Sequence, residues 1–520
     1  MTDTYYITTS IPYVNAKPHM GFALEIVQTD ALARYHRLRG DDVWFLTGTD
    51  ENSLSNIQAA VKEGIPTKQL VDRNAPFFRA LKEQLGLSFD DFIRTADEDR
   101  HLDGARKLWE ACDANGDIYV KDYEGLYCIG CERFYEPEEL TEGLCPEHQT
   151  APELVSEENY FFRLTRYADE LERLITSEQL RVVPQTRRNE VLSLIRMGLR
   201  DISISRSKER SQGWGVPVPG DEEQVMYVWF DALSNYINAL GYSQTSERYE
   251  HYWVNNPNRV HVIGKDISRF HAVYWPAMLL SAGIALPKII YVHGWINLDG
   301  QALSKSRGIV LDPVEIAANF GIDPLRYYLL RKISSWSDSN FSFDHLVQTY
   351  NSDLADQLGN LLSRVVAMVT KYFDGLVPGP TGDLPADMKL KSKASGLAER
   401  IDESMDAFLP GDALAAVWEL IAEANRYVVE NEPWNLAKRR AEDQLSEGRL
   451  ATVLYNLIET LRIVSWGCAP FIPATAAAIA SQLGIPAPTT GNLSEVFAWG
   501  GYPSGTPLAP AAVLFPKLEV

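Results

Sequence analysis

The order of hydrophobic and polar positions predicts alternating strands and helices near the start of the chain. Tyr5 to Ile11 is rich in β-branched and aromatic residues, which is typical of a strand. Phe22 to Arg39 carries apolar residues at helical spacing, and Val43 to Thr47 is a short apolar strand. This strand–helix–strand order predicts a parallel sheet, because parallel neighbours need a crossover helix between them.

Two more strands are predicted much later, at Arg259 to Ile263 and Lys288 to His293, with the helix-like segment Phe270 to Ala282 between them. The same α/β pattern therefore stands on both sides of a long intervening segment. A single sheet interrupted by an inserted domain explains this arrangement best.

The strand pattern thins out after about residue 350. Amphipathic helices are predicted instead, at residues 354–373, 388–408, 412–430 and 450–465. The Gly- and Pro-rich run 375–385 predicts a long loop, and residues 484–516 predict an irregular strap. We divide the chain into the first half of an α/β domain (1–115), an insertion that carries the clustered cysteines (116–220), the second half of the α/β domain (221–350) and an α-helical domain (351–520).

Composition places the chain among globular proteins of several domains. It has 520 residues, of which 45% are hydrophobic and 23% charged, and this excludes collagenous, mucin-like and wholly disordered classes. There is no run of about 18 or more apolar residues that could span a membrane. Met1 to Ile7 lacks the basic flank and apolar core of a signal peptide, so we expect a cytoplasmic protein.

The charge is strongly acidic overall but uneven along the chain. A net charge of −21 excludes a basic nucleic-acid coat. Residues 181–210 are an exception, with eight Arg or Lys against three acidic residues. This segment is either a local basic face or a solvated helix surface, and the sequence leaves both readings open.

The cysteines indicate a metal site rather than disulfides. The chain has five, and Cys128-x2-Cys131 is followed closely by Cys145-x2-His148. Each pair fits one tight turn, and three thiolates with one imidazole suit tetrahedral zinc. Since four protein ligands complete the shell, the ion is expected to be structural, with one per chain.

Two weaker motifs suggest phosphate binding. Pro18-His19-Met20-Gly21 stands between the first strand and the first helix, where backbone amides face an anion. Leu303-Ser304-Lys305-Ser306-Arg307-Gly308 follows the last predicted strand, and Lys305 would place a point charge on a triphosphate. Either motif alone is also compatible with an ordinary loop.

Over essentially its whole length the chain resembles methionyl-tRNA synthetases, a family of class I aminoacyl-tRNA synthetases. The matching stretches are YYITTSIPYVNAKPHMG, FLTGTDE, YCIGCERFYEPEELTEGLCPEHQ, YVWFDALSNYI, HVIGKDISRFHAVYWPAML, VHGWINLDGQALSKSRG, NLLSRV and ENEPWNLAK. The resemblance implies a Rossmann-type parallel sheet split by a zinc-binding connective insertion and followed by an all-α anticodon-binding domain. It also implies ATP-dependent activation of L-methionine, with magnesium accompanying ATP, and transfer to tRNA(Met).

The family's nucleotide signatures map onto this chain with departures. His-x-Gly-His corresponds to residues 19–22, so His19 is kept and Phe22 replaces the second histidine. Lys-Met-Ser-Lys-Ser corresponds to residues 302–306, so Lys305 is kept and Ala302 replaces the first lysine. Asn52-Ser53 replaces the usual His-Gly, and we expect all three departures at the nucleotide end. The implied ATP-binding residues are His19, Gly21, Phe22, Glu25, Gly264, Asp266 and Lys305, and the implied catalytic residues are His19, Lys305 and Arg206.

The implied methionine pocket is better preserved. An aromatic and aliphatic box suits an unbranched, polarizable thioether. Tyr13 and His271 would hydrogen-bond near the sulfur, and Asp50 would pair with the α-ammonium. The implied pocket residues are Ile11, Tyr13, Asp50, Trp229, Ala232, Tyr236, Ile267 and His271. Leu233 stands where the family commonly has proline.

The resemblance also assigns anticodon reading to Asn360, Arg364 and Trp434. Stacking and polar contacts to splayed bases would suit these residue types. The chain stops about where the family's anticodon domain ends, so we expect a monomer. The alternatives are a divergent paralogue that binds tRNA or amino acid with weak or no charging, and a duplicate serving resistance or biosynthesis. A small nucleotidylyltransferase and a helix-plus-zinc scaffold fit the sequence less well.

Overall fold

A six-stranded parallel sheet forms the centre of the larger lobe, in the order β3-β2-β1-β12-β13-β7. The computed structural model describes residues 3–135, 137–146, 149–298, 311–440 and 443–519, and the backbone of 301–302. The strands are β1 (Thr4–Thr8), β2 (Asp42–Thr49), β3 (Asp91–Arg94), β7 (Arg181–Val183), β12 (Asn258–Gly264) and β13 (Ile289–His293).

The sheet confirms the predicted α/β fold class and contains all four predicted strands. The structure adds β3 and β7 at the two edges, which the sequence analysis did not predict. Both are short, so neither carries enough alternation to stand out. β7 comes from the segment that we assigned to the insertion, yet it pairs with β13.

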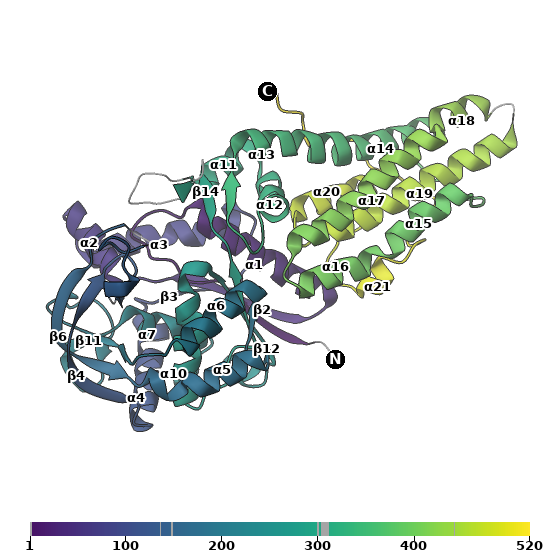
Figure 1. Cartoon of the computed structure of the whole chain (residues 1–520). Helices are drawn as coiled ribbons and strands as arrows, with labels where there is room; N and C mark the ends of the chain where they lie inside the picture. The colour runs from purple at the N-terminus through teal and green to yellow at the C-terminus, as the bar shows by residue number, and fades with distance from the viewer. Residues whose placement is uncertain are drawn as a thin grey trace.

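Helices and short strands surround this sheet (Figure 1). The helices of the larger lobe are α1 (Met20–Arg39), α2 (Leu54–Glu63), α3 (Thr67–Gln84), α4 (Asp103–Ala114), α5 (Ala168–Thr176), α6 (Gln185–Arg196), α7 (Val228–Leu233), α8 (Asn235–Asn238), α9 (Glu247–Tyr249) and α10 (Trp275–Ser281), with the short turns η1 (Glu98–Leu102), η6 (Lys265–Ile267) and η7 (Phe270–Tyr274). A small sheet of β14 (Ile296–Leu298), β15 (Gln301–Ala302) and β16 (Ser339–Phe341) follows β13.

The insertion builds its own antiparallel sheets. One contains β5 (Arg133–Tyr135), β4 (Ile118–Cys128), β6 (Glu153–Phe162) and β8 (Ile202–Ser203), in that order. The other contains β10 (Pro217–Val218), β11 (Asp221–Met226) and β9 (Ser205–Ser207). β4 ends at Cys128, so the first of the clustered cysteines is the last residue of this strand.

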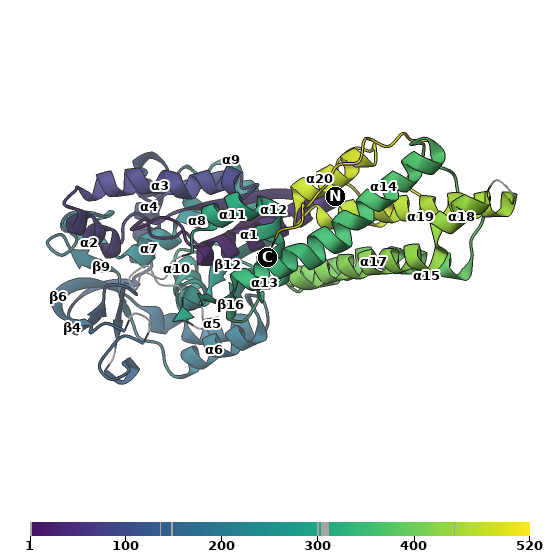
Figure 2. The ribbon, with the colours of Figure 1, turned by 90° about the horizontal axis from the view of Figure 1, so that it is seen from above.

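The C-terminal helices form an elongated second lobe that extends from one side of the sheet (Figures 1 and 2). They are α14 (Asn360–Phe373), α15 (Pro385–Ser395), α16 (Leu397–Asp406), α17 (Pro410–Asn431), α18 (Pro433–Arg439), α19 (Gln444–Cys468), α20 (Pro473–Gln482) and α21 (Leu493–Val496). The helix predicted at 388–408 is interrupted at Gly396, and residues 374–384 form the predicted loop. None of the described helices combines the length and apolarity needed to cross a bilayer.

The two lobes share one hydrophobic core through α1 and α12 (Ile322–Arg331). The connection to the helical lobe runs through α11 (Pro313–Phe320), α12, α13 (Phe343–Thr349) and η9 (Tyr350–Gly359). Arg326 on α12 is fully buried, pairs with Asp30 of α1 at 2.7 Å and donates to the carbonyl of Phe471 at 2.8 Å. This arginine therefore ties the helical lobe to the helix that caps the sheet.

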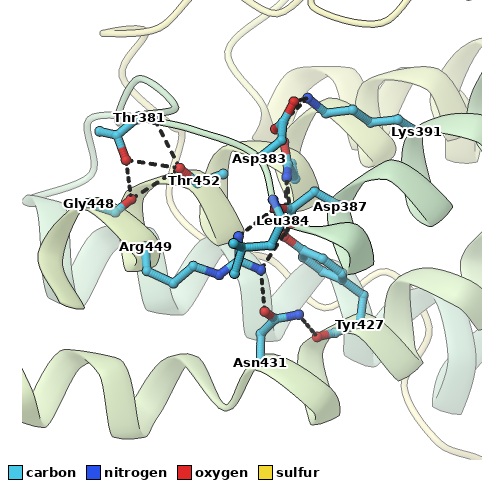
Figure 3. A network of polar contacts seen from close by, with 11 residues as sticks. Thr381, Asp383, Leu384, Asp387, Lys391, Tyr427, Asn431, Gly448, Arg449 and Thr452 are labelled. Atoms are coloured by element: carbon cyan, nitrogen blue, oxygen red, sulfur yellow. Dashed lines mark hydrogen bonds and ion pairs between the residues drawn. The ribbon is translucent and has the colours of Figure 1, made fainter. Parts of the chain in front are cut away.

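Inside the helical lobe, a polar network joins α15, α17 and α19 (Figure 3). The carboxylate of Asp387 accepts two hydrogen bonds from Arg449, at 2.6 and 3.0 Å, and one from the hydroxyl of Tyr427. Arg449 also binds Asn431 at the end of α17. Burial would raise the pKa of Asp387, but these donors hold the pKa below its usual value.

Candidate active site and metal centre

The candidate site lies beyond the carboxyl ends of β1, β2 and β12. β1 lies between β2 and β12, so the sheet order changes direction there, and such switch points open a crevice for ligands. The segment after β1 bridges to the segment after β2, where Tyr13 pairs with Asp50 and the Asp50 amide donates to Pro12 at 2.9 Å. Two segments predicted to bind methionine are thus joined directly.

An apolar box stands at this crevice. Ile11, Tyr13 and Trp229 pack against a buried cluster that includes Ala232. The Trp229 indole stacks on Phe270, with ring centroids 3.9 Å apart and planes 5° apart. The structure therefore brings these predicted pocket residues together. The sequence analysis missed Phe270, because an aromatic residue one helical turn from other aromatic residues is typical of a helix packed in the core.

His271 is held by two hydrogen bonds inside the protein. Its Nδ1 lies 3.0 Å from the carbonyl of Ile267 and its Nε2 lies 2.7 Å from the Tyr236 hydroxyl. A carbonyl only accepts, so Nδ1 carries the proton and Tyr236 donates to Nε2. Burial lowers the pKa of His271 to about 4, so the ring is neutral. His271 therefore orients Tyr236 and has no donor left for a ligand.

Asp50 is a buried carboxylate, 1% exposed, with no ion pair to a lysine or arginine in the described parts of the chain. Oδ1 accepts a hydrogen bond from the Asn52 amide at 3.2 Å. Burial, and then the nearby Asp231 carboxylate, raise the pKa of Asp50 well above its usual value. A site of this kind is ready for a cation supplied by a ligand.

Two further polar atoms of the box are buried without a hydrogen-bond partner among the described residues. They are the hydroxyl of Tyr13 and the indole Nε1 of Trp229. Buried polar atoms without a partner are rare in folded proteins. Together with Asp50, they indicate a polar ligand with an apolar side chain.

The nucleotide end begins at the N-terminus of α1. His19 is the N-cap, and its Nδ1 accepts a hydrogen bond from the Gly21 amide at 3.0 Å, which places the ring proton on Nε2. A Cβ on Gly21 would lie 2.8 Å from the His19 ring, so glycine allows this cap. The neighbouring amides are also engaged within the protein, since Met20 donates to the Leu311 carbonyl at 3.1 Å and Phe22 to the His19 carbonyl at 3.0 Å. What this end of α1 offers an anion is the positive end of the helix dipole and the His19 imidazole.

Phe22 and Glu25, two of the implied ATP-binding residues, both contact other side chains of the protein. Phe22 is buried and meets Phe78 of α3 edge-on at 5.8 Å. Glu25 is also buried, and its carboxylate accepts from Ser10 at 2.6 and 2.7 Å and pairs with His293 at 2.9 Å. Both side chains are already occupied by the protein, so they hold α1 against the sheet.

His293, at the end of β13, is a site residue that the sequence analysis missed. Its Nδ1 lies 2.7 Å from the Gly294 carbonyl and its Nε2 faces Glu25. Burial by itself would lower the pKa of His293, but the Glu25 carboxylate beside the ring raises this pKa above its usual value. His293 lies within the matching stretch VHGWINLDGQALSKSRG, but its pairing with Glu25 could not be predicted because the two residues are 268 positions apart.

Gly264 and Asp266 lie together at the end of β12. A Cβ on Gly264 would come within 2.8 Å of the Asp266 carboxylate, and Asp266 accepts from the Trp295 indole at 3.2 Å. Asp266 is exposed and available to a ribose or an amine. Ala302 lies in β15, and Lys305, with the rest of residues 303–310, lies outside the described residues.

Arg206 lies in the insertion and not among the groups above. It is 3% exposed, its guanidinium lies 4.3 Å from the Tyr227 ring centroid, and it donates to the carbonyl of Ser205 at 2.6 Å. Tyr227 belongs to the same cluster as the apolar box, so Arg206 contacts a residue that packs with the box. The catalytic role that the resemblance implies for Arg206 stays a prediction.

The other charges of residues 181–210 are largely neutralised within the protein. Arg187 pairs with Glu190, Arg196 with Glu172, and Arg210 with Glu153. Arg188 donates to the carbonyls that end α5. Of the two readings left open, the solvated helix surface describes this segment better.

Three cysteines form a compact cluster. Cys128, Cys131 and Cys145 are buried, and their sulfur atoms lie within 4.8 Å of one another. The Tyr135 hydroxyl lies 3.1 Å from the Cys131 sulfur. Three converging sulfurs suit a soft cation that binds thiolates. His148, the predicted fourth ligand, lies outside the described residues.

The predicted anticodon residues lie on the helical lobe. Asn360 and Arg364 are one turn apart on α14, and Arg364 donates to Asn425 of α17 at 2.9 Å. Trp434 is exposed on α18, at the end of the lobe farthest from the sheet (Figure 1). The structure gives no direct contact between Trp434 and the other two among the described residues.

Comparison with known protein families finds two matches. The family described as "tRNA synthetases class I (M)" matches residues 5–153 and 135–366. The family described as "Anticodon binding domain of methionyl tRNA ligase" matches residues 377–520. Together they span both lobes.

Curated relatives and solved structures agree with these matches. The methionine–tRNA ligase of Brucella suis biovar 1 is 44% identical over 519 residues, covering 99% of this chain and 98% of that protein. That of Caldanaerobacter subterraneus subsp. tengcongensis is 42% identical, covering 100% of this chain and 80% of the relative. The Mycobacterium tuberculosis methionyl-tRNA synthetase in complex with methionyl-adenylate superposes with a TM-score of 0.94 at 42% identity, covering 99% and 100% of the two chains.

Proposed function

The chain belongs to the methionyl-tRNA synthetase family of class I aminoacyl-tRNA synthetases, and on this premise we propose how its residues serve the family's reaction. The enzyme activates L-methionine with ATP to methionyl-adenylate and pyrophosphate, and then transfers the methionyl group to tRNA(Met). Both steps need reactants held in line with the developing charge stabilised. The residue assignments below are our proposals.

The observation that carries the amino-acid assignment is the buried Asp50 beside an apolar box. Its carboxylate would pair with the α-ammonium of methionine, which supplies the missing positive charge. Ile11, Trp229 and Ala232 would surround the side chain, and the Tyr13 hydroxyl is the donor available near the thioether. In this arrangement Ile267 fixes His271, which in turn fixes Tyr236 as a pocket wall.

For ATP, we assign the phosphates to the N-terminus of α1. The Nε2 of His19 would donate to a phosphate oxygen during attack at the α-phosphate, and the positive end of the α1 dipole would attract the phosphate charge. Gly264 and Asp266 would face the ribose or base, and Lys305 would close over the pyrophosphate. Magnesium, bound with ATP, would neutralise phosphate charge.

The cysteine cluster would hold one zinc ion, with His148 completing a tetrahedral shell. When bound, zinc fixes the loop after β4 and thereby the insertion. We expect about one zinc per chain in total-metal analysis and a loss of both metal and thermal stability in Cys145→Ser. Metal-free protein of unchanged stability would contradict this assignment.

Asn360, Arg364 and Trp434 would read the anticodon, the exposed Trp434 ring by stacking on an unpaired base and the two α14 side chains by polar contacts. Charging of tRNA(Met) would place the protein in the cytoplasm. We expect a monomer in sedimentation analysis.

The test of the proposed function is amino-acid-dependent ATP–pyrophosphate exchange with each of the twenty amino acids, followed by charging of tRNA(Met). Exchange with methionine alone is expected. Absence of exchange from folded, zinc-loaded protein would contradict activation and favour a duplicate that does not charge tRNA. Exchange without charging would support activation and contradict the proposed transfer to tRNA(Met).

A further inference from the structure

Asn52 replaces the family's usual histidine, and the structure puts it beside Asp50 rather than at the nucleotide end. Its backbone amide donates to Asp50 Oδ1 at 3.2 Å. Its side-chain Nδ2 donates to Asp231 Oδ2 at 2.7 Å and to the carbonyl of Thr95 at 3.2 Å. One residue therefore contacts the ammonium-binding carboxylate and a second buried carboxylate.

The second carboxylate is itself held from the opposite side. Asp231 is fully buried on α7, and its Oδ1 accepts from His101 Nε2. The Asn238 amide donates to His101 Nδ1 at 3.2 Å, so the proton of that ring lies on Nε2 and points at Asp231. Asp231 thus has donors on both oxygens and stays oriented without a cation.

α7 also carries Trp229 and Ala232, which line the apolar box. The hydrogen bond from Asn52 to Asp231 therefore links the segment that holds Asp50 to the helix that forms the side-chain wall. The distance between ammonium and side-chain subsites depends on this link.

We propose that Asn52 and Asp231 form a positioning pair that orients Asp50 for the methionine ammonium and fixes its distance from the α7 wall. The proposal rests on the proposed function, since it takes methionine as the ligand of Asp50. Neither residue touches substrate, so the pair acts through Asp50 and α7.

The pair also sets the charge around Asp50. The groups that face Asp50 are Asp231 on α7, Glu132 after β4, Glu51 beside it, Tyr13 after β1 and Tyr236 on α8. Asp231 contributes most to raising the pKa of Asp50 after burial itself. Methionine affinity should therefore fall as the pH is lowered, because its ammonium needs Asp50 ionised.

The first test is Asn52→Asp, which sets a carboxylate where the amide now donates to Asp231. We expect the methionine Kd, by equilibrium dialysis, and the methionine KM in exchange to rise about tenfold or more, the scale of a lost hydrogen bond to a charged group. The KM for ATP should change less than about threefold. The double variant Asn52→Asp with Asp231→Asn exchanges the amide and the carboxylate, so a donor again faces an acceptor at this contact. It should recover most of the affinity for methionine.

The second test is the pH profile of methionine binding in Asp231→Asn. Removal of the adjacent charge should shift the acid limb of the profile to lower pH, whereas a merely structural role would lower affinity equally at every pH. An unshifted limb would overturn the proposal, as would equal rises of the methionine and ATP KM in Asn52→Asp.

Asn456→Asp is the matched control. Asn456 is a buried amide that donates to Asp387 at 3.3 Å in the helical lobe, so the substitution creates the same kind of carboxylate pair far from the pocket. It should lower stability and leave methionine binding unchanged. If wild-type protein binds methionine without exchange, the proposed reaction fails while the binding tests still decide the positioning pair.

Discussion

Each lobe of the molecule contains a buried aspartate, and the two have opposite surroundings. Asp387 in the helical lobe has Arg449 and Tyr427 around it, which keep its pKa low (Figure 3). Burial, and then the Asp231 carboxylate, raise the pKa of Asp50 in the catalytic lobe, and Asp50 has no basic partner among the described residues. Neither side chain is accessible to solvent, but the protein supplies a counter-charge only to Asp387.

This difference separates a structural carboxylate from one prepared for a ligand. A buried carboxylate that is paired with an arginine of the same protein is part of the folded core. Removal of either partner lowers the free energy of unfolding strongly. A buried carboxylate without a cation costs stability until a ligand binds, as is typical of functional sites. The predictions below test this contrast.

The largest effect is expected from Asp50→Asn. The isosteric amide removes the charge that pairs with the methionine ammonium, so kcat/KM for methionine in exchange should fall about 100-fold or more. The KM for ATP should stay close to that of the wild type. A fall of less than about threefold would show that Asp50 is not the ammonium partner.

Next comes Arg449→Met, which leaves Asp387 buried without its cation. We expect a loss of about 3 kcal/mol in the free energy of unfolding, measured by denaturant titration. Methionine-dependent exchange, measured where the variant is folded, should be unchanged. Loss of exchange by folded protein would mean that the lobes are not functionally separate.

Trp434→Ala should weaken recognition of tRNA(Met) by the helical lobe and leave the buried core of that lobe unchanged. Loss of one stacked base is expected to lower kcat/KM for tRNA(Met) charging by about 10- to 100-fold, while exchange is retained. Phe497→Ala, a buried aromatic in the same lobe, serves as a control for general destabilisation. Equal loss of exchange and charging in Trp434→Ala would contradict the anticodon assignment.

The two aspartates should give opposite dependences of stability on pH. The raised pKa of Asp50 means that its ionisation costs stability as pH rises above its unfolded value, about 3.9, so Asp50→Asn should stabilise the free protein by about 1 kcal/mol or more at pH 8. The lowered pKa of Asp387 contributes stability above that pH and loses it as pH falls. Thermal melts of Asp50→Asn and Asp387→Asn between about pH 2 and pH 8 would test both signs, because the Asp387 contribution is lost mainly below about pH 4.

The smallest effect on activity is expected from Phe22→His, which restores the family signature. Because Phe22 packs against Phe78, we expect a destabilisation of about 1–3 kcal/mol and a change in exchange below about threefold. A rise of about tenfold or more in exchange would instead show that a second histidine donor was missing.

Much of the site was accessible from the sequence through the resemblance. The cysteine spacing predicted a compact cluster, and Ile11, Tyr13, Trp229 and Ala232 do lie together. The nucleotide end was less predictable. The aromatic rings around Arg206 are a contact that no local pattern predicted, and its catalytic role stays a prediction.

Local order along the chain determined the fold class, the principal strands and helices and the cysteine knuckle, because periodicity and short spacing are local properties. Tertiary structure alone decided the charge environment of Asp50, the pairing of Glu25 with His293 and the position of Asn52 between two carboxylates. These depend on burial and on partners up to 268 positions apart, which no local pattern records.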